Sequence, residues 1–311
     1  AAWHLSRLFK SRKPDVIHAH DAHSIAIAVL ARALTRHANA PPIVASRRVD
    51  FHVGRNAFSR LKYRQVDQFL CASSAIRNML ISDGVPTERT TVVHEGVDLA
   101  QVNGAPTLDL HREFGQPVGA PIVGNVAALA PHKGQHYLIE SIALVLREVP
   151  DARFLIVGAG ELKDTLTRQI QRLHLDNHVI LTGFRTDALS ILKGLDLFVM
   201  SSVTEGLCTS ILDAMAAGKA VVATRAGGIP ESVIDDHTGL LVPVRDAAGL
   251  AHAIVTLLKD EARRRAFGIA GHNRAQEVFR ADRMVDETAG VYAARVDTTR
   301  ARDNDRHPAT P

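Results

Sequence analysis

Short apolar runs alternate with amphipathic helical segments along the first third of the chain. Residues 3–13 and 24–36 place apolar side chains at helical spacing and are predicted as helices. Four short runs are predicted as strands: "PDVIHAH" (14–20), "PIVASR" (42–47), "QFLCAS" (68–73) and "TVVHEGVD" (91–98). Alternating strands and helices are typical of a parallel sheet covered by helices.

A second series of such units follows the polar segment 100–116, which is predicted to be a linker. Its predicted strands are "PIVGNVAAL", "ARFLIVG", "HVILTGF", "LDLFVMSS", "KAVVAT" and "LLVPV". The fold class is therefore α/β, with two Rossmann-like, doubly wound parallel-sheet domains.

One of these segments, "DARFLIVGAGELK", is close to the glycine fingerprint of dinucleotide-binding proteins. In that fingerprint the third glycine allows the helix to pack closely on the strand, but Lys163 occupies its place here. The sequence therefore argues against a dehydrogenase.

Composition fits two globular domains with ordinary cores, because 46% of the 311 residues are hydrophobic and 23% are charged. No apolar run approaches the roughly 18 residues of a membrane-spanning helix, and no stretch has the layout of a signal peptide. Cys71 and Cys208 are too few for a disulfide framework and lack metal-ligand spacing. We expect a soluble protein of the reducing cytoplasm.

Positive charge is concentrated at the front, where residues 1–103 hold 14 Lys and Arg against 8 Asp and Glu. Residues 3–13, "WHLSRLFKSRK", combine cations with apolar side chains, and a second basic run covers 47–64. Such a surface suits anionic lipid headgroups at the inner face of a membrane, or a phosphorylated acceptor. An ordinary solvated helix face is the alternative. No motif for binding nucleic acid accompanies the charge.

Candidate chemistry centres on "TEGLCTSILDAMAAG" (204–218), where Glu205 and Asp213 lie on either side of a loop-to-helix junction. The helix is predicted to end with Gly218 at its C′ position, and its first turn exposes unpaired N–H groups at 207–210. Backbone N–H groups of this kind bind anions. Two carboxylates beside a phosphate site suit a ligand with sugars on both sides of a phosphate, as in a nucleotide sugar.

The alternative is that Glu205 only interacts with the helix dipole and that Asp213 is an exposed helical acid. The next segment argues for a site, because "ATRAGGIPE" brings the paired Gly227 and Gly228 and a helix start at Pro230.

These motifs together resemble the family 4 retaining glycosyltransferases, enzymes of the two-domain B-type fold. The resemblance extends from Ile122 to Asp246 through "VAALAPHKG", "FLIVGAGE", "SSVTEGLCTSILDAMAAGKAVVAT", "GGIPE" and "TGLLVPVRD", and is looser in "DVIHAH" and "VVHEGVD". It implies two domains facing a cleft: an acceptor-side domain at 1–103 and a nucleotide-sugar domain at 104–280. A helix at 281–297 would pack back towards the first domain, and 298–311 would form a disordered tail. The first domain would be incomplete, lacking about 60 residues at its front.

The resemblance also implies three catalytic residues. Glu205 matches the first acid of the family's acid-x7-acid signature and would bind the donor sugar, whereas Lys133 would neutralise the diphosphate. His20 would stand beside the reacting centre on the acceptor side. The plainer alternatives are a surface lysine in a turn and a structural histidine at a strand end.

The remaining donor contacts follow the same correspondence. Asp213 stands where the family usually has a second glutamate on the ribose, and the base would pack near Phe184 and Arg185. The loop whose amides would cradle the diphosphate consists of Gly206, Leu207, Cys208 and Thr209.

A departure from the family pattern occurs at Ala128, the position of an arginine that shares the diphosphate charge. Loss of one charge-assisted partner costs about 1.5 to 3 kcal/mol unless another cation replaces it. His132 and Arg185 are the candidate replacements.

The implied reaction moves a sugar from a nucleoside diphosphate sugar to an acceptor hydroxyl with retention at the anomeric carbon, in cell-envelope polysaccharide or lipopolysaccharide synthesis. The acceptor would be lipid-linked or a saccharide, and neither a cofactor nor a metal is expected. Two alternatives stay open. A non-catalytic scaffold or partner subunit is favoured by Ala128, Asp213 and the short front, and an epimerase on the same fold would form product without an acceptor.

Overall fold

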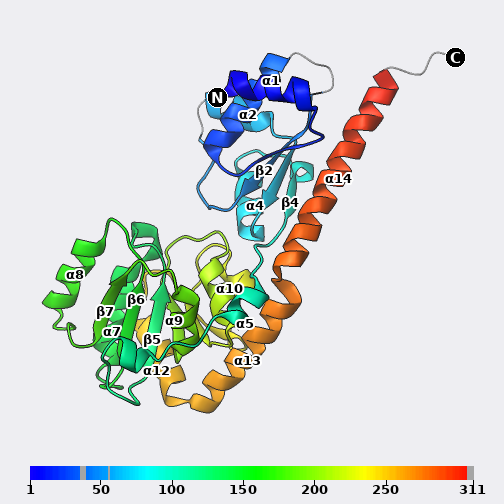
Figure 1. Cartoon of the computed structure of the whole chain (residues 1–311). Helices are drawn as coiled ribbons and strands as arrows, with labels where there is room; N and C mark the ends of the chain where they lie inside the picture. Colours follow the sequence, from blue (N-terminus) through cyan, green and yellow to red (C-terminus); the bar gives the residue numbers. More distant parts are fainter. Residues whose placement is uncertain (36–39, 55–56, 307–311) are drawn as a thin grey trace. The chain divides into compact units, whose positions relative to one another are not determined.

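The computed structural model describes residues 1–35, 40–54 and 57–306. They divide into two compact units (Figure 1). The first is formed by Ala1–His94 together with the chain from Asp282 onward, and the second is the continuous segment Glu95–Ala281. The predicted boundary at 103/104 therefore differs from the division in the structure, which falls after His94.

The first unit contains a four-stranded parallel sheet whose strands follow one another in chain order. The strands are β1 (Ile17–Ala19), β2 (Ile43–Arg47), β3 (Gln68–Cys71) and β4 (Thr90–Val92). Its helices are α1 (Ala2–Arg12), α2 (Ala22–Thr35), α3 (Ala57–Arg64), α4 (Ser74–Ser82) and the short η1 (Thr87–Arg89). The apolar strand runs are buried because helices cover a parallel sheet.

The last helix, α14 (Ala281–Arg306), completes the core of the first unit. Its Val291 and Tyr292 pack against a cluster that includes Val44 and Leu70 of the sheet. The prediction of a disordered tail at 298–311 is wrong for residues 298–306, which continue the helix. Residues 307–311 lie outside the described part of the chain.

The second unit contains a six-stranded parallel sheet in the order β10-β9-β8-β5-β6-β7. The strands are β5 (Ile122–Val126), β6 (Arg153–Val157), β7 (Val179–Gly183), β8 (Leu197–Met200), β9 (Val221–Thr224) and β10 (Gly239–Val242). The chain builds outward from β5 to β7, returns to β8 beside β5, and then builds out on the other side to β10. The connections after β5 and β8 therefore run to opposite sides of the sheet, although the two strands are neighbours. Such a place in the strand order is called a switch point, and doubly wound sheets bind their ligands there.

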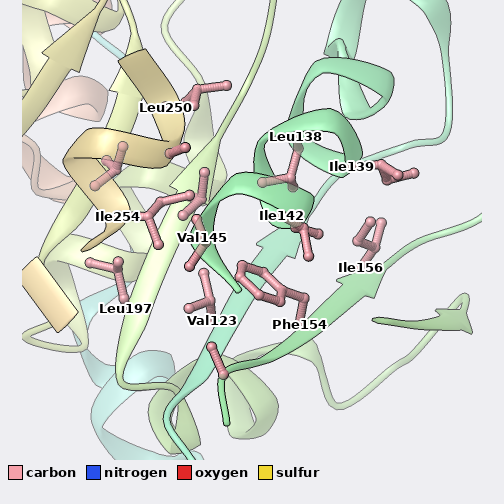
Figure 2. Close-up of a cluster of buried hydrophobic side chains, with 14 of the residues drawn as sticks. Val123, Leu138, Ile139, Ile142, Val145, Phe154, Ile156, Leu197, Leu250 and Ile254 are labelled. Carbon is pink, nitrogen blue, oxygen red and sulfur yellow. The ribbon is translucent and has the colours of Figure 1, made fainter. Parts of the chain in front are cut away.

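The core of the second unit fills the space between the sheet and the helices α7 (Gln135–Val145) and α12 (Ala247–Lys259), as Figure 2 shows. Leu138 and Ile142 of α7 and Ile254 of α12 are fully or almost fully buried, as is Phe154 of β6. The other helices are α5 (Leu99–Gly104), α6 (Leu110–Glu113), η2 (Pro131–Lys133), α8 (Lys163–Arg172), α9 (Ala188–Gly194), α10 (Thr209–Ala216), α11 (Ile229–Ser232) and α13 (Glu261–Val278).

Every run predicted as a strand overlaps a strand, and the α/β prediction with parallel sheets is confirmed. Residues 100–116, predicted as a linker, instead contain most of α5 and all of α6. Each of these helices begins at an aspartate cap, since Asp98 accepts from the N–H of Gln101 and Asp109 from that of Arg112. Within the described residues, none of the helices combines the length and the apolarity needed to cross a membrane.

Candidate active site

The candidate site lies where β5 and β8 end side by side in the sheet. The two strands pair at Val123 with Leu197 and at Gly124 with Phe198. Buried Asn125 ties them together, because its side-chain Nδ2 donates to the backbone oxygen of Val199 at 2.8 Å. The loop after β5 carries Lys133, and the loop after β8 carries Glu205.

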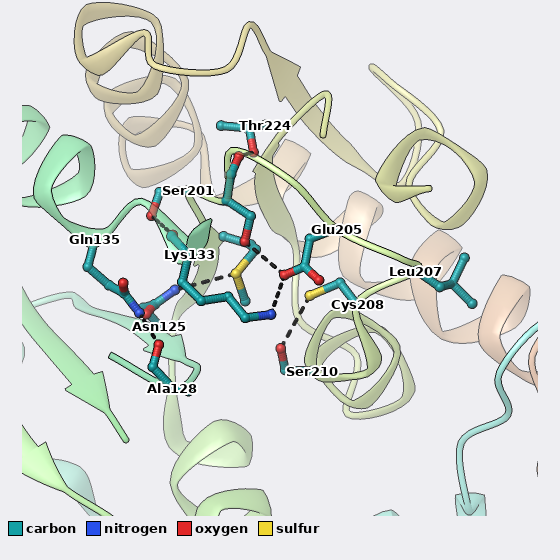
Figure 3. A network of polar contacts seen from close by, with 12 residues as sticks. Asn125, Ala128, Lys133, Gln135, Ser201, Glu205, Leu207, Cys208, Ser210 and Thr224 are labelled. Atoms are coloured by element: carbon teal, nitrogen blue, oxygen red, sulfur yellow. Dashed lines mark hydrogen bonds and ion pairs between the residues drawn. The ribbon is translucent and has the colours of Figure 1, made fainter. Parts of the chain in front are cut away.

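Backbone contacts hold the Lys133 loop against the β8 loop (Figure 3). The N–H of Val203 donates to the oxygen of His132 at 2.8 Å, and the Ser201 hydroxyl donates to the oxygen of Lys133 at 3.1 Å. Gly134 adopts a φ of 64°, and a Cβ there would overlap the Ser201 backbone oxygen. Close approach of the two loops thus requires a glycine after the lysine.

Lys133 and Glu205 form an ion pair in which Nζ lies 2.5 Å from Oε1. The Ser202 hydroxyl donates to the same carboxylate oxygen at 2.8 Å. Glu205 is only 7% exposed, and the Lys133 side chain retains 19% exposure. Among the contacts of the described residues, Oε2 of Glu205 has no protein donor, so it can accept a hydrogen bond from a ligand hydroxyl.

The glycine pair predicted to border the site holds the backbone of Glu205. The N–H of Gly228 donates to the Glu205 oxygen at 3.3 Å. Gly227 adopts a φ of 49°, and a Cβ at this position would overlap the same oxygen. Since the neighbouring Thr224 hydroxyl donates to Ser202 at 2.5 Å, the end of β9 also fixes the Glu205 loop.

The loop 206–209 makes a tight turn into α10. Cys208 adopts a φ of 75° and is the N-cap residue of the helix, with no side-chain cap hydrogen bond. The first N–H groups of a helix have no intrahelical partner, so this end favours a negatively charged group. Leu207 is buried, and burial raises the pKa of the Cys208 thiol to about 12, so the thiol stays protonated at neutral pH. Both side chains are therefore packed in the protein interior, so that a ligand at this turn would meet the backbone.

Helix α10 is fixed at its far end as the sequence predicts. Gly218 has a φ of 70° and donates to the oxygen of Met215 at 2.9 Å, and Lys219 donates to that of Ala214 at 2.9 Å. This pair of bonds is the Schellman ending of a helix. His272 of α13 also lies 2.6 Å from the oxygen of Ala216. The C-terminal end of α10 is therefore fixed both by its own backbone bonds and by α13.

Asp213 lies one turn inside α10 and is partly buried, which excludes the alternative of an exposed helical acid. Burial raises the pKa of this carboxyl from 3.8 to about 6. Ionisation above pH 6 therefore disfavours the folded protein, and a ligand that donates hydrogen bonds to the carboxylate would recover part of this free energy.

Asp213→Asn is expected to stabilise the free protein by about 1 to 3 kcal/mol at pH 7.5, because the amide carries no charge to desolvate. The gain should shrink as the pH falls from 6 towards 4, where the native carboxyl takes up its proton. Urea denaturation of both proteins across this pH range measures the difference. A difference that does not change with pH would contradict the burial argument.

Phe184 and Arg185 follow β7, and polar contacts hold the Arg185 side chain in place. Its guanidinium donates to Glu113 at 2.8 Å and to Asp187 at 2.7 Å and lies over the ring of Phe114. Two carboxylates therefore already engage Arg185, which argues against its use as a replacement for the arginine missing at Ala128. Phe184 is 76% exposed, as a surface for a planar base requires.

Ala128 and Lys133 both lie in the segment that follows β5. Ala128 is exposed there, and Lys133 is partly exposed. The backbone oxygen of Ala128 accepts from the side chain of Gln135 at 2.8 Å.

Among the described residues, no group of three or more His, Cys, Asp or Glu side chains is arranged to hold a metal ion.

His20 belongs to the first unit, just beyond the end of β1, where its side chain is exposed. Its ring lies 4.0 Å from that of His18, measured between centroids. His18 is bonded at both nitrogens, to the Tyr292 hydroxyl at 2.5 Å and to the Ser46 hydroxyl at 2.8 Å. Burial and the charges of His20 and Arg48 lower the pKa of His18 to about 4.

His18 contacts the ring of His20 within the first unit, and the residue pattern assigned it no role. The signal available was the alternation in "HAH", which places His18 and His20 on the same side of a strand. Because His18 is neutral at physiological pH, His20 packs against an uncharged ring.

A doubly wound sheet with a helix N-terminus and a carboxylate at its switch point is the arrangement of nucleotide-binding α/β proteins. The family model described as "Glycosyl transferases group 1" matches residues 107–274, and that described as "Glycosyltransferase Family 4" matches residues 1–101. The chain belongs to the group 1 glycosyl transferases, with two parallel-sheet α/β domains of the B-type fold.

Among curated relatives, the chain is 31% identical over 312 residues to a GDP-mannose-dependent alpha-(1-6)-phosphatidylinositol monomannoside mannosyltransferase from Mycolicibacterium smegmatis. That match covers 92% of this chain and 81% of the relative. It is also 31% identical over 179 residues to the lipopolysaccharide core biosynthesis glycosyltransferase LpsE from Rhizobium meliloti, covering 58% of this chain and 52% of the relative. The chain thus spans about half the length of the second relative.

Among solved structures, the chain is similar to the Anabaena protein HepE in complex with UDP. The TM-score is 0.80 at 25% sequence identity, and the match covers 93% of this chain and 82% of HepE.

Proposed function

We propose that the protein transfers a glycosyl group from a nucleoside diphosphate sugar to an acceptor hydroxyl, with retention at the anomeric carbon. The observation that carries this proposal is the Lys133–Glu205 pair at the switch point, beside the N-terminus of α10. A cation and free backbone N–H groups suit a diphosphate, and a buried carboxylate with a free oxygen suits a sugar hydroxyl.

In this mechanism, the bond from the anomeric carbon to the diphosphate breaks as the acceptor oxygen bonds to that carbon. Negative charge grows on the leaving diphosphate, where Lys133 and the α10 amides stabilise it. These groups are already in place, so little reorganisation is needed. Since they supply the positive charge, we propose that turnover needs no metal ion.

The other donor contacts are assigned by position. The loop 206–209 would hold the diphosphate, and Asp213 would accept from the ribose hydroxyls. Phe184 and Arg185 would border the base, and His20 would orient the acceptor side of the reaction. HepE binds UDP and the Mycolicibacterium relative is named for GDP-mannose, so the base is a matter for experiment.

The acceptor we propose is lipid-linked or a saccharide in cell-envelope or lipopolysaccharide synthesis, reached from the cytoplasm at an anionic membrane. The relatives named for a phosphatidylinositol mannoside and for the lipopolysaccharide core support it. So does α1, where Trp3 and Leu8 are 56% and 49% exposed among Arg7 and Lys10. Vesicle sedimentation tests this part, because binding to anionic vesicles that does not weaken with salt, or no binding, would contradict it.

The reaction itself is tested by a thermal-shift titration with UDP, GDP, ADP and their sugar conjugates. One nucleotide should raise the Tm by about 5 °C or more at one hundred times its Kd. Activity is then measured with that donor, with and without EDTA, and the anomeric configuration of the product is read by NMR. Loss of turnover in EDTA would contradict the metal-free mechanism.

Two other results would favour other functions. No stabilisation by any nucleotide would favour a non-catalytic partner, for which Ala128 and Asp213 already argue as departures from the family pattern. Product formed from the donor without an acceptor would favour an epimerase.

A further inference from the structure

In the free site, the two charged groups assigned to the donor satisfy each other. Lys133 Nζ lies 2.5 Å from Oε1 of Glu205, and both side chains are largely shielded from water. In Figure 3 the lysine side chain extends directly towards the carboxylate. Charge-assisted hydrogen bonds of this kind are among the stronger polar contacts in proteins. A ligand that binds Lys133 and separates it from Glu205 must therefore offer the carboxylate another hydrogen-bond donor.

A nucleoside diphosphate and a nucleotide sugar differ in what they offer this pair. Both bring an anion for Lys133. Only the intact donor also brings sugar hydroxyls that can donate to Glu205. With the diphosphate alone, the carboxylate is left in a buried place without its cation and next to additional negative charge, which is strongly unfavourable.

The backbones on either side of the pair are anchored, so the pair can re-form by side-chain movement alone. Gly227 and Gly228 hold Glu205 from the β9 side, and the Ser202 hydroxyl orients its carboxylate. The close contact of Gly134 with Ser201 holds the lysine loop. Once the sugar has left, Glu205 is still within reach of Lys133.

We propose that the Lys133–Glu205 pair makes the site select the intact nucleotide sugar over the nucleoside diphosphate that the reaction releases. The inference rests on the proposed function and deepens it. After transfer, Glu205 loses its sugar partner and competes with the diphosphate for Lys133. The carboxylate that helps to hold the donor thus also promotes release of the product.

Calorimetric titrations of Glu205→Gln with UDP, UDP-glucose, GDP and GDP-mannose test this inference. The amide cannot hold the lysine as a carboxylate does, so affinity for the diphosphate should rise about tenfold, a difference of 1.4 kcal/mol. Affinity for the sugar conjugate should rise less or fall, so the ratio of the diphosphate Kd to the sugar-conjugate Kd falls. Glu148→Gln is the matched control, because it removes the same charge from an exposed pair with Lys259 and should leave the ratio unchanged.

The gain must also depend on Lys133. In a Lys133→Met background, Glu205→Gln should no longer raise diphosphate affinity, and an equal gain there would mean a general charge effect and overturn the inference. Unchanged or weaker diphosphate binding by Glu205→Gln, with wild-type binding intact, would overturn the inference and leave the proposed function standing. If the wild type binds none of these nucleotides, the proposed function fails and the inference fails with it.

Discussion

Lys133→Ala is expected to lower kcat about 100- to 1,000-fold, the usual cost of removing one preorganised group that stabilises charge in the transition state. In the proposed reaction, the α10 amides alone would face the charge that grows on the departing diphosphate. The measurement is steady-state turnover with the donor identified by thermal shift. Lys259→Ala is the matched control, because its lysine forms an exposed pair with Glu148 and should keep full activity.

Loss of stability must be separated from loss of catalysis in this variant. Removing one partner of a buried pair costs about 3 to 5 kcal/mol, and less here because Lys133 keeps 19% exposure. The double variant Lys133→Ala/Glu205→Gln removes both charges and should regain part of the Tm without regaining activity. Turnover by Lys133→Ala within twofold of the wild type would show that this lysine has no part in the chemistry.

Gly227→Ala is expected to destabilise the protein by about 2 to 5 kcal/mol and to abolish donor binding. An alanine at a φ of 49° costs about 1 to 2 kcal/mol, and its Cβ would overlap the Glu205 backbone oxygen. Relief of that overlap has to separate the Gly227 segment from the Glu205 backbone, which disturbs the position of the carboxylate. Urea denaturation measures the stability, and calorimetry with the identified nucleotide sugar measures the binding.

Gly218→Ala is the matched control for this effect. Gly218 also has a positive φ, of 70°, but nothing lies within 4 Å of a Cβ added there. The Gly218→Ala variant should therefore lose only about 1 to 2 kcal/mol of stability, the cost of placing alanine at a positive φ, and should still bind the donor. Equal losses in the two variants would mean that the contact with Glu205 is unimportant.

Periodicity was enough to predict the strands, because runs such as 195–202 are buried on both faces of a parallel sheet and read as continuous apolar segments. It failed at α5 and α6. These helices are too short to show a period, and only the aspartate caps at Asp98 and Asp109 could have indicated them. It also failed beyond residue 297, where polar composition suggested disorder although the helix continues to Arg306.

The candidate site could be located from the sequence but not its internal pairing. Motif order placed Lys133 and Glu205 on two loops, and the strand order brings those loops together at the switch point. That the two side chains form a pair depends on side-chain conformation and on close backbone contacts at Gly134 and Gly227. The same is true of Arg185, whose carboxylate partner Glu113 lies far away in the sequence.

The first unit takes its last helix from the segment that follows the second unit. Most of the first unit is therefore synthesised before the second unit, but it can be completed only after the second unit. Glu95–Ala281 is continuous and can fold as soon as it has left the ribosome. The first unit is translated earlier, but Val44 and Leu70 can be covered by Val291 and Tyr292 only after α14 has been synthesised. A ribosome that stalls after α13 would therefore carry one folded unit and one with an exposed apolar face, the species that chaperones recognise.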